Sequence, residues 1–201
     1  EKLASLGEMA GGVAHEIRNP LGGIKMATNL LSSGDLDGRP LSQEMARAIL
    51  AGIAEIEGII NSLLDYTRDT RLERAEYEVA RILDPVVETA AAAGRVKGVA
   101  VAYGHVERDA VALVDGQRLR QVFANVLQNA LEAISAGAAG GQVTVDLRAD
   151  GERVVVEVSD NGSGITPEDR EKIFMPFFTT KPSGTGLGMS IVKKIVDLHG
   201  G

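Results

Sequence analysis

A histidine, a glutamate and an asparagine lie close together near the start of the chain, in a segment whose spacing predicts a helix. Glu16 directly follows His15, and Asn19 stands four residues after the histidine, on the same helical face. A neutral imidazole is a nucleophile near neutral pH, an adjacent carboxylate can take up its proton, and an amide can orient a water. Pro20 should bend the helix here because it removes a backbone donor. A solvated surface histidine is the alternative that this pattern alone leaves open.

A second polar set lies on a helix predicted over residues 116–136. Gln121, Asn125 and Asn129 form a stripe at i, i+4 and i+8 beside an apolar face. Amide oxygens are ligands that Mg²⁺ accepts when phosphates and water complete its coordination. The stripe therefore indicates a magnesium site, and a solvated polar face is the alternative.

A carboxylate and two glycines end a predicted strand further along the chain. Asp160 follows three valines at alternate positions, so it stands at the end of a row that we expect to be buried. A buried carboxylate needs a hydrogen-bond donor, and the exocyclic amine of a nucleobase is a suitable one. Gly162 and Gly164 then turn the chain tightly and let a ligand approach the backbone.

A glycine-rich run opens the last predicted helix, which we place at residues 186–198. Gly184, Gly186 and Gly188 belong to this run, and Lys181 precedes it. Backbone N–H groups at the start of a helix bind phosphate, and the lysine adds a positive charge. The run is not the dinucleotide-binding pattern, because no strand directly precedes it. Ordinary turns are the alternative.

Two long amphipathic segments come before the sheet-forming part of the chain. Residues 1–31 and 42–67 repeat small or apolar residues at alternating spacings of three and four, which predicts helices packed as in a coiled coil. Residues 32–41 are rich in Ser, Gly, Asp and Pro and are interpreted as a loop. Each helix of such a hairpin buries only one seam, so we expect a dimer with a four-helix core. The two predicted seams are Leu3, Leu6, Ala10, Val13, Ile17, Leu21, Ile24 and Leu31, and Met45, Ile49, Ile53, Ile56, Ile60, Leu63 and Thr67.

The order of helical and strand patterns in the second part of the chain predicts an α/β layer domain. The charged stretch 68–78 lacks the helical repeat and is interpreted as a linker. An Asp-Gly pair between two alternating apolar runs predicts a β-hairpin. Besides the helices predicted at 116–136 and 186–198, this part is predicted to contain a helix at 80–93 and strands at 99–103, 111–114, 143–147 and 154–158. A long functional loop is predicted at 161–186.

Composition narrows the classes of function. The 201 residues are 44% hydrophobic and 24% charged, which is typical of one or two folded domains. A net charge of −7, no basic run and 3% aromatic residues argue against nucleic-acid binding. The chain has no cysteine, no apolar run long enough to cross a membrane and no signal peptide, which fits the cytoplasm and no direct membrane contact. It begins within a helical repeat, so we expect a longer protein.

The order of these motifs resembles that of the sensor histidine kinases of two-component systems. The matching stretches are GGVAHEIRNPLGGI (11–24) for the H box, NVLQNA (125–130) for the N box, DNGSGI (160–165) for the first glycine box, IFMPFFTTK (173–181) for the F box and GTGLGMSIV (184–192) for the second glycine box. The F box looks most like that of the nitrogen-regulation-type subgroup, whose partners often activate sigma-54 promoters.

The resemblance implies an α+β protein with two domains. Residues 1–70 would form the dimerisation and histidine-phosphotransfer hairpin, as a four-helix bundle in the homodimer, and residues 71–78 the linker. Residues 79–201 would form a catalytic ATP-binding domain, an α/β sandwich shared with gyrase B, the MutL proteins and the ninety-kilodalton heat-shock chaperone. It also implies a cytoplasmic location, with any membrane anchor elsewhere in the full-length protein.

The resemblance further implies an activity and a set of site residues. His15 would be phosphorylated from ATP and pass the phosphoryl group to an aspartate on the receiver domain of a response regulator, with Glu16 as general base and Asn19 assisting phosphatase activity. Asn125 and Asn129 would hold Mg²⁺, and Asp160 would bind the adenine amino group. The remaining nucleotide-binding residues would be Gly162, Gly164, Ile165, Lys181, Gly184, Thr185, Gly186, Leu187 and Gly188, under a lid anchored by Phe174, Phe177 and Phe178.

Two features depart from the family pattern. Glu132 stands where many members have Lys, so Lys181 or an arginine such as Arg118 would have to supply a cation. The family also continues past the final His-Gly-Gly sequence, so we expect the ATP-binding domain to be truncated at its C-terminus here. The alternatives to an autokinase are therefore a protein that acts mainly as a response-regulator phosphatase and a nucleotide-binding dimeric scaffold without catalysis. A DNA-handling ATPase of the same fold is disfavoured because the chain is acidic.

Overall fold

The computed structural model describes residues 2–32, 41–67, 71–134, 140–181 and 184–201. The chain divides into two units, of which one contains Glu1–Arg68 with Met175–Leu187 and the other Asp69–Phe174 with Gly188–Gly201. Among the described residues, no helix has both the length and the apolar character needed to span a membrane.

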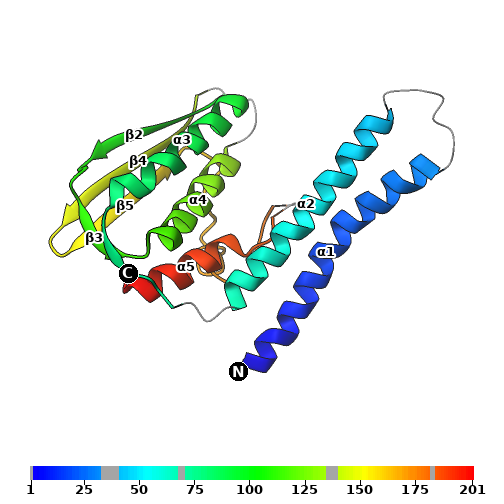
Figure 1. Cartoon of the computed structure of the whole chain (residues 1–201), viewed down its shortest axis with the longest axis horizontal. Coiled ribbons are helices and arrows are strands. Elements are labelled where there is room, and N and C mark those ends of the chain that lie inside the picture. Colours follow the sequence, from blue (N-terminus) through cyan, green and yellow to red (C-terminus); the bar gives the residue numbers. More distant parts are fainter. Residues whose placement is uncertain (1, 33–40, 68–70, 135–139, 182–183) are drawn as a thin grey trace. The chain divides into compact units, whose positions relative to one another are not determined.

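The first unit contains a helical hairpin. Helix α1 covers Lys2–Ser32 and helix α2 covers Leu41–Thr67, which confirms both predicted helices (Figure 1). Helix α1 continues through Pro20. Most of the predicted loop at 32–41 lies outside the described residues.

The buried residues of the hairpin differ from those of the predicted seams. Pro20, Ala27, Gly52 and Ile59 are buried, and none of them belongs to either seam. A Cβ built on Gly52 would lie 2.9 Å from Cγ1 of Ile24 and 3.3 Å from the carbonyl oxygen of Pro20. The apolar spacing did not identify this contact because a glycine and a proline that allow close approach carry no hydrophobic signal.

The second unit is built around a mixed three-stranded sheet. Its strands are β2 (Val99–Val106), β4 (Gly141–Asp150) and β5 (Arg153–Asp160), with β2 parallel and β5 antiparallel to β4. Helices α3 (Val79–Lys97) and α4 (Gly116–Ala133) cover one face of this sheet, and α5 (Gly188–His199) packs on α4 (Figure 1). Its most deeply buried side chains are Leu83, Leu127, Leu131, Val143, Val145 and Leu147. The α+β fold class and the mixed sheet agree with the expectation.

A two-stranded ribbon completes the second unit and corrects the predicted linker. Strand β1 (Ala75–Glu78) pairs antiparallel with β3 (Val111–Val114), with Ala75 opposite Val114 and Glu78 opposite Val111. Residues 68–78 were predicted to be a linker because they are charged and lack the helical repeat. Pairing with β3, which is distant in sequence, holds these residues as a strand, while residues 68–70 lie outside the described part.

Candidate functional site

Helix α4 carries the predicted magnesium ligands, and a buried aspartate fixes where it begins. The carboxylate of Asp115 accepts hydrogen bonds from the backbone N–H groups of Gln117 and Arg118, both at 3.1 Å, and so caps the helix. The polar stripe of Asn125 and Asn129 is half-buried rather than fully solvated. The helix therefore presents both amides from a rigid and partly enclosed position.

Asn125 is held by the first residue of helix α5. Its Nδ2 donates a hydrogen bond to the carbonyl oxygen of Gly188 at 3.3 Å. A Cβ built on Gly188 would lie 3.8 Å from Cγ of Asn125, so the two residues are in van der Waals reach. Because the amide nitrogen faces Gly188, the amide oxygen is the atom of Asn125 that fits a hard cation.

The loop after β5 is fixed against the end of α4. Gly162 N–H donates to Oδ1 of Asp160 at 2.9 Å, and Ser163 N–H donates to the carbonyl oxygen of Ala133 at 3.0 Å. A Cβ on Gly162 would lie 2.6 Å from the backbone of Ala133, so only glycine fits there. Asp160 itself is exposed and not buried as expected, although it pairs with the buried Val143 of β4. The carboxylate is thus accessible to a base.

Gly164 and Ile165 lie further along this loop. Gly164 has a φ of +70°, which favours glycine, and Ile165 is 52% exposed. Sequence reasoning missed the part played by Asn161, whose Oδ1 accepts from Gln142 N–H at 2.8 Å and whose Nδ2 donates to Gly140 at 2.9 Å. Asn161 therefore ties the loop to the start of β4, a role typical of asparagine in turns.

The glycine segment before α5 folds on itself. Phe177 N–H donates to the carbonyl oxygen of Gly186 at 3.1 Å, and both residues have positive φ, +64° and +62°. Thr179 Oγ1 accepts from Lys181 N–H at 3.0 Å, and a Cβ on Gly184 would lie 2.5 Å from the same Oγ1. Helix α5 begins at Gly188, two residues later than predicted, because the left-handed turn at Gly186 comes first.

Two neighbouring positions of this segment complete the predicted nucleotide set. Thr185 Oγ1 accepts from the N–H of Leu187 at 3.4 Å, and the Leu187 side chain is fully buried. The hydroxyl thus caps the turn that leads into α5. The threonine and leucine have local structural roles, and their predicted role in nucleotide binding stays a prediction.

The predicted phosphoacceptor set lies on α1. His15 and Glu16 belong to this helix, but their side chains lie outside the described part of the structure. Asn19 is exposed one turn later, and Pro20 beside it is buried. An exposed amide at this position is accessible to water or to a partner.

The two candidate replacements for the missing lysine differ in their surroundings. Glu132 accepts a hydrogen bond from Gln128 Nε2 at 2.6 Å, along the exposed side of α4. Arg118 lies in the first turn of α4, where its Nη1 donates to Gln121 Oε1 at 3.2 Å. Two helical turns separate Arg118 from Asn125, or about 10 Å along the axis. The position of Lys181 near the glycine segment makes it the better candidate for a phosphate.

Two family profiles match the chain. Residues 5–71 match the His Kinase A (phospho-acceptor) domain. Residues 114–201 match the histidine kinase-, DNA gyrase B-, and HSP90-like ATPase. The first match contains His15 and Asn19, and the second contains Asn125 and Asp160.

Known proteins resemble the chain over all or part of its length. The sensor histidine kinase ZraS of Salmonella typhi is 33% identical over 202 residues, which cover 100% of this chain and 43% of that protein. The histidine kinase ThkA, solved in complex with the response regulator protein TrrA, is 30% identical with a TM-score of 0.81, covering 100% of this chain and 57% of that chain. The separate catalytic domain of ThkA is 32% identical with a TM-score of 0.57, covering 63% of this chain and 82% of that chain. The chain thus spans less than half the length of the curated relative.

Proposed function

This chain belongs to the sensor histidine kinases, and from that premise we propose that it phosphorylates its own His15 with ATP. The observation that carries the proposal is that one chain matches both a phosphoacceptor domain and an ATP-binding domain. A DNA-handling ATPase would need only the second of these. The narrower likeness to the nitrogen-regulation-type subgroup stays a prediction.

The proposed reaction is an in-line transfer of the γ-phosphoryl group. A ring nitrogen of His15 forms a bond to phosphorus, the bond between the β–γ bridging oxygen and the γ-phosphorus breaks, and ADP leaves. Glu16 takes the proton that the imidazole ring loses. Most of the catalysis would come from positioning, so the residues that hold the nucleotide are as important as the nucleophile.

The nucleotide-binding roles rest on the geometry of α4 and the loop after β5. Asn125 and Asn129 would hold Mg²⁺ through their amide oxygens, and the hydrogen bond from Asn125 to Gly188 supports this orientation. Bound Mg²⁺ supplies neutralisation of phosphate charge. Asp160 would accept from the adenine amino group, supported by its exposure. Lys181 and Gly184 would lie with the phosphates.

The proposed partners are a second copy of the chain and the receiver domain of a response regulator. A dimer is supported by large apolar side chains that are exposed on the hairpin, including the predicted seam residues Leu21, Ile53 and Ile60 at 49%, 42% and 45%. A response regulator is supported by the ThkA–TrrA complex. We place the reaction in the cytoplasm, where ATP and receiver domains occur.

The test is incubation of the chain with γ-labelled ATP and Mg²⁺, followed by treatment of the product with acid and with base. A phosphohistidine loses its label in acid and keeps it in base. His15→Ala should remove the label and leave binding of a fluorescent ATP analogue intact. His105→Ala is the matched control, because His105 is an exposed histidine on β2 and should label as the wild type does. Label that persists in His15→Ala would overturn the assignment.

Phosphatase activity toward the response regulator is a second candidate function, favoured by the exposure of Asn19. An exposed amide four residues after the phosphoacceptor can orient a water for hydrolysis. Asn19→Ala should therefore slow dephosphorylation of the regulator and spare labelling of His15. If the wild type binds ATP but neither labels itself nor dephosphorylates a regulator, the scaffold alternative replaces both proposals.

A further inference from the structure

Helices α4 and α5 are joined by a hydrogen bond at each end of their contact. Asn125 Nδ2 donates to the carbonyl oxygen of Gly188 at 3.3 Å at one end. At the other end, the backbone N–H of Asp115 donates to Nε2 of His199 at 3.0 Å. The His199 ring also has Nδ1 at 2.8 Å from the carbonyl oxygen of Ile195, so Nδ1 carries the proton. The two helices form one antiparallel pair that is closed at both ends.

The carboxylate of Asp115 has two separate tasks at the second of these ends. Its Oδ1 accepts from the N–H groups of Gln117 and Arg118, which caps α4. Its Oδ2 accepts from the backbone N–H of Glu73 at 3.0 Å. Burial opposes ionisation of this group, but the three backbone donors and the charge of Arg118 hold the pKa of Asp115 below its usual value. The helix cap uses only Oδ1 of this carboxylate, so the bond from Glu73 to Oδ2 is a separate contact.

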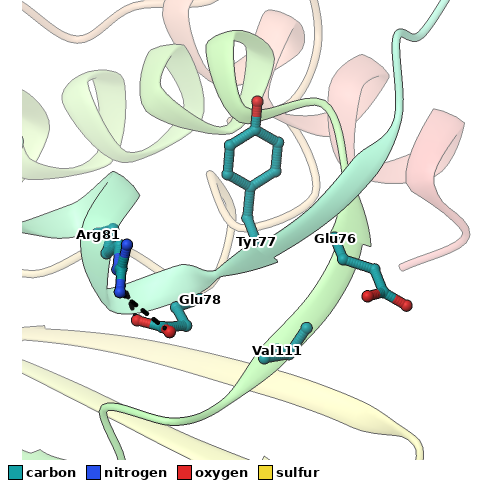
Figure 2. Close-up of a pocket in the computed structure, with 5 residues that line it drawn as sticks. All are labelled: Glu76, Tyr77, Glu78, Arg81 and Val111. Carbon is teal, nitrogen blue, oxygen red and sulfur yellow. Dashed lines mark hydrogen bonds and ion pairs between the residues drawn. The ribbon is translucent and has the colours of Figure 1, made fainter.

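Two more contacts attach the same connecting segment to the helix pair. The guanidinium of Arg74 donates to the carbonyl oxygen of Leu198 in the last turn of α5. A Cβ on Gly116 would lie 3.2 Å from Cζ of Tyr77, so the tyrosine ring lies against the first residue of α4. Figure 2 shows that Tyr77 points to the opposite side of β1 from Glu76. Residues 73–77 are therefore attached to both helices at once.

We infer that Asp115 is a positioning residue that couples residues 71–78 to the helix pair holding Asn125. The inference rests on the proposed kinase function, because Asn125 acts there on the nucleotide. Ten residues of α4, or about 15 Å of rigid helix, separate Asp115 from Asn125. Residues 71–78 follow the phosphoacceptor hairpin in sequence, so displacement of this segment is transmitted along α4 to the nucleotide-binding amide.

Hydrogen exchange in the full chain without nucleotide tests the coupling independently of catalysis. Asn125→Ala opens the far end of the helix pair and is expected to speed exchange of the Glu73 amide by about fivefold. In an Asp115→Asn background the same change should have no further effect on Glu73. Gln128→Ala, on the exposed side of α4, is the control and should leave that amide unchanged. Unchanged Glu73 exchange in Asn125→Ala would overturn the inference.

Kinetics test the positioning role. Asp115→Asn keeps an oxygen for the helix cap but places an amide nitrogen where Oδ2 accepts from Glu73. We expect kcat for labelling to fall about tenfold, with KM for ATP within about twofold of the wild type. Glu73→Pro removes the backbone N–H that donates to Asp115 and should lower kcat by the same factor. Glu73→Ala keeps the backbone N–H and should behave as the wild type.

The outcomes separate the inference from the proposed function. If Asp115→Asn and Glu73→Pro lose thermal stability but keep the wild-type kcat, Asp115 is a helix cap only and the inference is wrong. If the wild type incorporates no label while Asn125→Ala still changes exchange at Glu73, the kinase assignment fails and the coupling stands.

Discussion

Asn125 donates a hydrogen bond to the carbonyl oxygen of Gly188, 3.3 Å away, and this bond joins two motifs that are 63 positions apart in sequence. One residue belongs to helix α4 and the other is the first residue of helix α5. The bond uses the amide nitrogen, so the amide oxygen is the atom of Asn125 that fits a cation. The predicted N box and the last glycine of the predicted second glycine box therefore meet in the fold.

Asn125→Ala should weaken nucleotide binding chiefly when Mg²⁺ is present. The variant loses the proposed metal ligand, so affinity for ATP with Mg²⁺ is expected to fall about tenfold, which is about 1.4 kcal/mol. Affinity measured in excess chelator should change much less. Titration with a fluorescent ATP analogue, with and without Mg²⁺, measures both. Gln128→Ala, on the exposed side of α4, is the control, and an equal loss under both conditions would argue against a metal role.

Gly162→Ala should distort the loop after β5. An added Cβ would lie 2.6 Å from the carbonyl carbon and oxygen of Ala133, which are backbone atoms that cannot rotate away. We expect a loss of about 1–3 kcal/mol in unfolding free energy and weaker ATP binding, since Asp160 shares this loop. Ser163→Ala is the control, because the bond from Ser163 to Ala133 uses only its backbone N–H. Wild-type melting of Gly162→Ala would contradict the packing argument.

The sequence predicts the regular elements well where the pattern is local. Strand 111–114 is confirmed at both ends, and the β-hairpin forms around Gly151, whose φ is +61°. Helix α3 extends four residues past its predicted end to Lys97, where Gly98 terminates it in a left-handed conformation. A search for the C-terminal glycine cap would have found this end.

Features that depend on distant parts of the chain were not predictable in this way. Strand β1 is held by β3, and charged AEYE carries no strand signal of its own. Leu127 and Leu131 are among the most buried side chains, but the apolar face predicted for this helix consisted of Leu119, Val122, Phe123, Val126, Ala130 and Ile134. They line a groove between α4 and α3 and stand beside the predicted face, so the buried stripe of α4 is wider than predicted. Asp115 follows the known preference for Asp at helix starts, which is the signal that could have identified it.

The close approach at Gly52 predicts an asymmetry between two glycines of helix α2. Gly52→Ala brings a Cβ within 2.9 Å of Ile24 and 3.3 Å of the Pro20 carbonyl, whereas nothing lies within 4 Å of a Cβ on Gly58. Alanine favours a helix over glycine by about 1 kcal/mol, so Gly58→Ala should raise the melting temperature. Gly52→Ala should lower it or leave it unchanged, because the clash offsets that gain. Equal stabilisation by both, in thermal unfolding, would contradict the observed contact.

The buried carboxylate of Asp115 predicts a specific dependence of stability on pH. Its folded-state pKa lies below the usual value, so its contribution to unfolding free energy is complete above the unfolded pKa of about 3.9. The contribution is lost as pH falls through the folded-state pKa, when protonation removes the charge that its three backbone donors face. Asp115→Asn has no such titration. The stability difference between wild type and Asp115→Asn should therefore be largest near neutral pH.

Urea unfolding of both proteins, at neutral pH and at about pH 3, measures this difference. Other carboxylates titrate over the same range, but they are present in both proteins and cancel in the comparison. We expect the wild type to be more stable by about 1–3 kcal/mol at neutral pH, the usual size for hydrogen bonds to a charged group. The gap should narrow in acid. A gap that stays constant or widens would mean that the charge of Asp115 does not stabilise the fold, and that its hydrogen bonds to α4 and Glu73 act as neutral ones.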